Sequence, residues 1–159
     1  MNPHSADPTL LLLLDEVRRK TLTRLEGLTE TQARFAPEGL QNSILWHAGH
    51  CYIVVEWLTM EALGGATTSP PTWFELFSWA SRPGENPNVA WPTLDEVIQE
   101  LQLQHGRMHK LLQNLTAEDF DNPARNRPDI TVRHRILHAL HDEACHSGEI
   151  WLLRKLQGV

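Results

Sequence analysis

Apolar residues recur every three to four positions in four long stretches of the chain, which is the spacing of helices that bury one face. The pattern predicts helices over residues 8–27, 43–63, 93–115 and 131–157. Each predicted helix begins beside a residue whose side chain can cap a helix N-terminus. These capping residues are Asp7, Ser43, Thr93 and Thr131.

The segments between the predicted helices have the composition of turns and loops. The longest, residues 65–92, contains five prolines and predicts a crossover interrupted by a short helix at Trp73–Trp79. Its aromatic residues either cover the opening of a pocket or cap one end of the core. No segment alternates apolar and polar residues in the manner of a strand. The expected fold is therefore all-α: one domain, residues 1–159, forming a four-helix bundle with a long crossover between the second and third helices.

Composition excludes several classes of function. The net charge is −6 and the basic residues are scattered, which argues against a nucleic-acid partner. The one run of three, Arg18-Arg19-Lys20, is expected on a solvated helix face. Leu10 to Leu14 is too short an apolar run to span a membrane. Cys51 and Cys145 are too few for a disulfide framework, so we expect a cytoplasmic protein without a membrane partner.

The last predicted helix combines core packing with candidate chemistry. Its predicted buried face consists of Val132, Ile136, Ala139, Leu140, Ala144, Ile150, Trp151 and Leu153. Asp142 and His146 are four residues apart at the edge of this face, so both side chains can reach one point. Glu143 points further into the face. The remaining candidates, expected on the solvated side, are His134, His138, His141 and Cys145.

The second predicted helix, residues 43–63, is apolar around most of its circumference. His47 and His50 are therefore expected in or beside the interior. A buried imidazole needs partners for its ring nitrogens, and these can be a neighbouring carbonyl, a water or a metal ion. The pattern alone leaves a structural core histidine and a metal ligand both open.

Two segments, SILWHAGH and HDEACHSGEIWLLRKLQG, resemble the DinB-like (DinB/YfiT-like) superfamily of bacterial proteins. In that superfamily a histidine four residues after a tryptophan in the second helix is a metal ligand, which corresponds to Trp46 and His50. The last helix usually carries two ligand histidines four residues apart, and His146 matches the second. Asp142 stands in the place of the first. His141 lies five residues before His146 and is rotated away by about 140°.

The resemblance implies a divalent metal, such as zinc, nickel, iron or manganese, held by His50, Asp142 and His146. It also implies a homodimer and a metal-dependent transferase that joins a low-molecular-weight thiol to an electrophilic small molecule. Three protein ligands leave open coordination positions for such chemistry. Glu143 is the expected catalytic residue, orienting a ligand or moving a proton. His47 and His141 remain alternative ligands.

Three other interpretations compete with a metal-dependent transferase. A di-iron carboxylate site needs two Glu-x-x-His motifs, and the sequence has this spacing only at Glu143 and His146. A Cys-His nucleophile is disfavoured because Cys51 and Cys145 each adjoin a histidine in sequence and so point elsewhere on the helix. The third alternative is a non-catalytic metal-binding or stress-response scaffold whose site has decayed.

Overall fold

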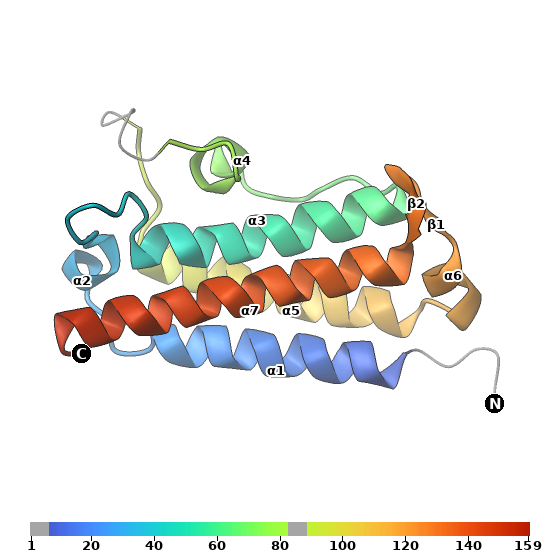
Figure 1. Ribbon diagram of the computed structural model, residues 1–159, viewed down its shortest axis with the longest axis horizontal. Helices are drawn as coiled ribbons and strands as arrows, with labels where there is room; N and C mark the ends of the chain where they lie inside the picture. The colour runs from blue at the N-terminus through green and yellow to red at the C-terminus, as the bar shows by residue number, and fades with distance from the viewer. Residues whose placement is uncertain (1–6, 83–88) are drawn as a thin grey trace.

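The computed structural model describes residues 7–82 and 89–159 and places four long helices side by side (Figure 1). These helices are α1 (Pro8–Leu25), α3 (Ile44–Leu63), α5 (Leu94–Gln113) and α7 (Val132–Gln157). The four expected helices are thus confirmed, each with its ends within two residues of the prediction. All four predicted capping side chains accept backbone N–H groups: those of Asp7, Ser43, Thr93 and Thr131.

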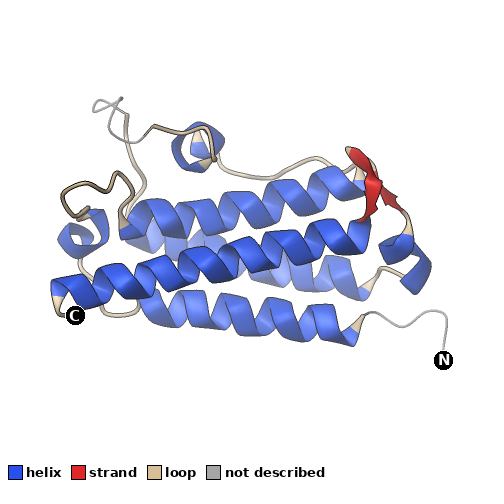
Figure 2. Cartoon of the chain, in the orientation of Figure 1, coloured by secondary structure: helices blue, strands red, loops and turns tan. Residues whose placement is uncertain are grey.

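The connections contain shorter elements (Figure 2). These are α2 (Glu30–Arg34), α4 (Trp73–Phe77), α6 (Ala117–Asp121), β1 (Pro123–Ala124) and β2 (Arg127–Thr131). Helix α4 is the expected short helix of the crossover, of which residues 83–88 lie outside the described part. The antiparallel pair β1–β2 was not predicted, because a two-residue strand and a strand that begins Arg-Pro show no alternating pattern. Among the described residues no helix has both the length and the apolar character needed to cross a membrane.

Helix α3 is the most deeply buried of the long helices, since it packs against α7, α5, α4 and α2. Every residue from Ile44 to Glu56 is buried, as the apolar circumference of this stretch predicted. His47 and His50 are each 4% exposed. The expectation that both histidines lie in the interior is confirmed.

The buried face of α7 differs from the predicted one at two positions. Ala144 is exposed and Trp151 is 47% exposed, whereas Glu143 and Ser147 are buried. The buried stripe follows three- and four-residue steps through polar as well as apolar residues, and apolarity alone did not mark it. The residues expected on the solvated side are all exposed: His134, His138, His141 and Cys145.

The expectation that Arg18 lies on a solvated face is wrong. Its side chain is 0% exposed and crosses the core between α1, α5 and α7. Its Nε and Nη2 donate to the two carboxylate oxygens of Glu143 at 2.8 and 2.9 Å. The guanidinium also donates to the Leu101 carbonyl at 2.6 Å and to Gln104 Oε1 at 2.8 Å. Burial of this charge is possible because the surrounding acceptors satisfy it.

Candidate metal centre

Helices α3 and α7 bring three of the predicted site residues together. His50 Nε2 lies 3.4 Å from Asp142 Oδ2, and His146 Nε2 lies 3.9 Å from Asp142 Oδ1. One ligand atom from each of the three residues falls within 4.8 Å of the others. Within residues 7–82 and 89–159 this is the one group of three or more His, Cys, Asp or Glu side chains with such spacing.

The orientation of His50 is set by the crossover. Its Nδ1 lies 2.6 Å from the carbonyl oxygen of Phe77 at the end of α4. A carbonyl only accepts, so Nδ1 carries the proton and Nε2 presents its lone pair toward Asp142. The Trp46 ring stacks on the imidazole with centroids 4.7 Å apart and planes 15° from parallel. These contacts hold His50 in the form that a metal ligand requires.

His146 has a comparable partner in His47. The Nδ1 atoms of the two rings lie 2.9 Å apart, so one donates and the other accepts. His47 Nε2 lies 3.8 Å from the Glu149 carboxylate, which favours a proton on that nitrogen. His47 then accepts through Nδ1 and His146 donates, which leaves His146 Nε2 with a free lone pair facing Asp142. His47 is therefore placed behind the ligand histidine, not among the three ligands.

The pKa shifts of His47, His146 and Asp142 suit a cation at neutral pH. Burial lowers the pKa of His47 to about 3, with a further contribution from the charges of His146 and His50. Burial and the charge of His50 lower the pKa of His146 to about 4, against the opposing effect of Asp142. For Asp142 burial raises the pKa, but the interactions with His50, His146 and His138 lower it overall. Neutral imidazoles and an ionised carboxylate are the forms that bind divalent metals, so this donor set fits such an ion.

A comparison with models of known families matches residues 13–150 of the chain to the DinB superfamily. The chain belongs to the DinB superfamily. A crystal structure of a conserved protein from Enterococcus faecalis has the same fold, with a TM-score of 0.74 and 18% sequence identity over 93% of this chain and 94% of that one. A comparison with curated proteins found no match. The resemblance expected from SILWHAGH and HDEACHSGEIWLLRKLQG is thus confirmed.

In this DinB superfamily chain two other predicted residues lie away from the cluster. The Glu143 carboxylate is fully buried, and both its oxygens accept from Arg18. This pairing gives Glu143 a structural partner on α1, and its catalytic role stays a prediction. His141 is exposed, with Nε2 3.7 Å from Cys145 Sγ. Cys145 adjoins His146 in sequence, but its histidine contact is with His141, one turn earlier on the same face of α7.

The cluster opens into a hollow of about 510 Å³ between α3, α7 and the crossover. Its lining residues are Trp46, His50, Val54, Leu58, Trp79, Arg135, His138, Asp142 and His146. The aromatic residues of the crossover were expected either to cover a pocket or to cap the core. Trp79 lines this hollow, whereas Trp73 and Phe77 pack in the core. Arg135 was not predicted, and His138, although exposed as expected, lines the hollow beside the candidate ligands instead of lying away from them. The available signal was the spacing of three and four residues that places them on the same stripe as Asp142.

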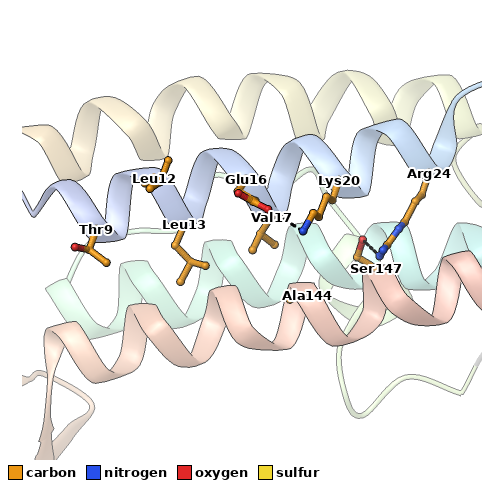
Figure 3. A pocket seen from close by; sticks show the side chains of 9 residues that line it. All are labelled: Thr9, Leu12, Leu13, Glu16, Val17, Lys20, Arg24, Ala144 and Ser147. Atoms are coloured by element: carbon orange, nitrogen blue, oxygen red, sulfur yellow. Dashed lines mark hydrogen bonds and ion pairs between the residues drawn. The ribbon is translucent and has the colours of Figure 1, made fainter.

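A second hollow of about 470 Å³ lies between α1 and α7 of this superfamily member (Figure 3). Leu12, Leu13 and Val17 line it together with Ala144, and Arg24 donates to Ser147 Oγ at 2.7 Å at one end. The single metal-ligand group found among the described residues lies elsewhere. We therefore assign the candidate chemistry to the hollow that contains the histidines.

Substitution of Gly49 by alanine is expected to disturb the centre through Phe77. A Cβ at Gly49 would lie 2.3 Å from Phe77 Cδ1, so the ring and the carbonyl that orients His50 must shift. We expect a loss of about 1–3 kcal/mol in the free energy of unfolding, the usual cost of overpacking. Metal affinity should fall as well. Urea unfolding and competition with a metal indicator measure the two effects.

Gly106→Ala is the matched control, because a Cβ there meets nothing within 4 Å and the site lies inside α5. Alanine at an open helical position is expected to stabilise by about 0.5–1 kcal/mol. Equal stability changes and unchanged metal affinity in the two variants would contradict the role given to the contact between Gly49 and Phe77.

Proposed function

We propose that this protein binds a divalent metal through His50, Asp142 and His146 and transfers a small thiol onto an electrophilic small molecule. The observation that carries the proposal is the convergence of these three ligand groups beside an open hollow of about 510 Å³. Three protein ligands leave coordination positions for an outside ligand. Imidazole and carboxylate donors suit zinc, nickel, iron or manganese.

A divalent cation held by His50, Asp142 and His146 would lower the pKa of a bound thiol and so favour the nucleophilic thiolate near neutral pH. The hydrogen bonds of His50 with Phe77 and of His146 with His47 hold both imidazoles with Nε2 toward the ligand position. Preorganised ligands of this kind do not need to reorient during the reaction. The protein thereby supplies a fixed site for the sulfur atom.

Other residues that line the hollow exclude water and accept the proton of the thiol. Trp46, Val54 and Leu58 form apolar surface that displaces water around the two substrates. His138, one turn before Asp142, accepts the proton of the thiol at an imidazole nitrogen. The sulfur then forms a bond to the electrophilic carbon, and the leaving group departs with its electron pair. No oxidant or reductant is consumed.

A transfer assay tests the proposed function. Protein loaded with zinc, nickel, iron or manganese is incubated with cysteine, glutathione or coenzyme A and an aryl halide, and the thioether product is followed by absorbance. We expect a rate clearly above that of a His50→Ala variant for at least one thiol. His134→Ala is the control, since this exposed histidine of α7 does not line the hollow. Rates equal to those of His50→Ala for every thiol and metal would favour the non-catalytic scaffold.

A further inference from the structure

Arg135 in the first turns of α7 has a single carboxylate partner within 4.0 Å among the described residues, that of Glu61, and no hydrogen bond to it. Its Nε is buried without a hydrogen-bond partner, and the guanidinium makes no hydrogen bond within the described part of the chain. The nearest carboxylate is that of Glu61 on α3, 3.7 Å from Nη2 and too distant for a hydrogen bond. Glu61 already accepts from Asn126 Nδ2 at 2.7 Å.

This lack of hydrogen-bond partners is costly and unusual. A buried donor without an acceptor costs about 1–3 kcal/mol, and more when it is charged. Arg154 shows the ordinary arrangement, because its Nη1 donates to the carbonyls of Arg24 and Glu26 even though its Nε is also unpaired. The side chain of Arg135 is 16% exposed, and the open space that it meets is the hollow of the metal centre. An anionic ligand in the hollow would supply acceptors for the Nη groups of Arg135.

The hollow has two chemically different ends. On α7 its lining residues Arg135, His138 and Asp142 follow one another by three and four residues, so they lie along one stripe. On α3 the facing wall runs from His50 through Val54 to Leu58. The candidate metal ligands occupy one end and the guanidinium the other. Seven residues separate Arg135 from Asp142, a rise of about 10 Å along the helix.

We propose that Arg135 is a binding residue for a carboxylate of the thiol substrate, whose sulfur lies at the metal centre of the same hollow. This inference rests on the proposed function, because it places the thiol in that hollow. The two Nη groups of an arginine can donate together to the two oxygens of a carboxylate. The net charge of −6 gives the protein no general attraction for anions, so a local cation is needed to select them.

The substrate class that follows is a small thiol with a carboxylate several bonds from its sulfur and an apolar or neutral segment between the two. Val54 and Leu58 offer apolar contacts along the middle of the hollow. A thiol ending in a hydroxyl group would keep the sulfur and the apolar contacts but would lose the charge-assisted hydrogen bonds. Charged hydrogen bonds of this kind contribute about 1.5–3 kcal/mol, which corresponds to about 10- to 100-fold in affinity.

Isothermal titration calorimetry tests the carboxylate subsite with two matched probe series. Zinc-loaded protein is titrated with ω-mercaptoalkanoates of increasing chain length and with the mercaptoalcohols of the same lengths. We expect the native protein to bind the best carboxylate probe at least about 10-fold more tightly than its alcohol counterpart. In Arg135→Gln this preference should fall to within about twofold, while zinc affinity stays unchanged.

Two further variants separate the subsite from folding and from net charge. Arg135→Lys keeps the charge but lacks the paired Nη donors, so an intermediate preference of about threefold is expected even if Arg135→Gln folds poorly. Arg19→Gln makes the same change in net charge at an exposed residue of α1 and should keep the native preference. A native protein that binds both series equally, or binds neither, overturns the subsite. So does a preference that survives in both Arg135 variants.

The outcome for the subsite is distinguishable from the outcome for thiol transfer. Turnover with the same thiols is measured separately against the His50→Ala variant. A carboxylate preference that depends on Arg135, without turnover, supports the subsite and contradicts the transfer. Turnover without any preference for carboxylates supports the transfer and contradicts the subsite.

Discussion

Glu143→Ala is expected to lower the free energy of unfolding by about 3–5 kcal/mol, the usual cost of removing one partner of a buried ion pair. The reason is that Arg18 would remain charged in the core without the two hydrogen bonds of 2.8 and 2.9 Å that now satisfy it. Urea unfolding followed by circular dichroism measures the change. We expect a large fall in the urea concentration at the unfolding midpoint. The slope of the free energy of unfolding against urea concentration should change little.

The ion pair between Glu16 and Lys20 on the surface of α1 provides the control. Its atoms are 2.8 Å apart, but its side chains are 49% and 52% exposed. Glu16→Ala is therefore expected to cost no more than about 1 kcal/mol. Equal costs for Glu143→Ala and Glu16→Ala would contradict the structural importance of the buried pair.

A paired replacement separates the buried charge from the loss of packing. Arg18→Met combined with Glu143→Leu removes both charges and keeps apolar volume in their place. Such replacements of a buried ion pair are often neutral or stabilising, so the double variant should be more stable than Glu143→Ala alone. A double variant that is less stable would show that the hydrogen bonds of Arg18 to Leu101 and Gln104 matter more than its unpaired charge.

Asp142→Ala is expected to lower metal affinity by more than about 100-fold, the upper range for loss of a residue that only supports a ligand. Asp142 lies between the two imidazoles, 3.4 Å from His50 Nε2 and 3.9 Å from His146 Nε2. Its removal leaves two neutral donors and no negative charge to balance the cation. Competition with a chelating indicator, using protein without a polyhistidine tag, measures the affinity.

His141→Ala is the matched control, because this exposed histidine precedes Asp142 directly and its Nε2 contacts Cys145 instead of the cluster. Metal affinity in this variant should equal that of the native protein. If His141→Ala abolishes binding and Asp142→Ala leaves it intact, the ligand assignment is wrong. A helix wound differently around residue 142 would then be required.

The long helices were predictable because each has a continuous apolar period and a capping residue at its start. Asp142 and His146 were predictable for a related reason, since a spacing of four residues fixes their relation within one helix. The approach of His50 to them across two helices came from the resemblance to a family, because the period of one helix does not specify its neighbour. The carbonyl of Phe77 that orients His50 had no sequence signal, because every residue carries a carbonyl.

The errors also have physical causes. Arg18 was assigned to the surface because it stands in a run of three basic residues. Its position four residues after Leu14 and three before Thr21 places it on the buried stripe of α1. The inward direction of Glu143 suggested a catalytic role, which stays a prediction, and the ion pair with Arg18 accounts for that direction. A buried acid and a buried base on different helices are best considered as partners before either is given a chemical role.

The buried ion pair between Arg18 and Glu143 helps to fix the direction of the candidate ligand Asp142. Asp142 and Glu143 are consecutive, so their side chains diverge by about 100° around the axis of α7. Because Arg18 donates hydrogen bonds to Glu143, rotation of α7 about its axis is opposed. Asp142 therefore stays directed at His50. A rotation of α7 by one residue position would place a neighbouring residue where Asp142 now lies. The group of three candidate ligands would then be lost. The ion pair thus limits rotation of α7, and rigidity at the candidate metal centre originates on an adjacent face of the helix.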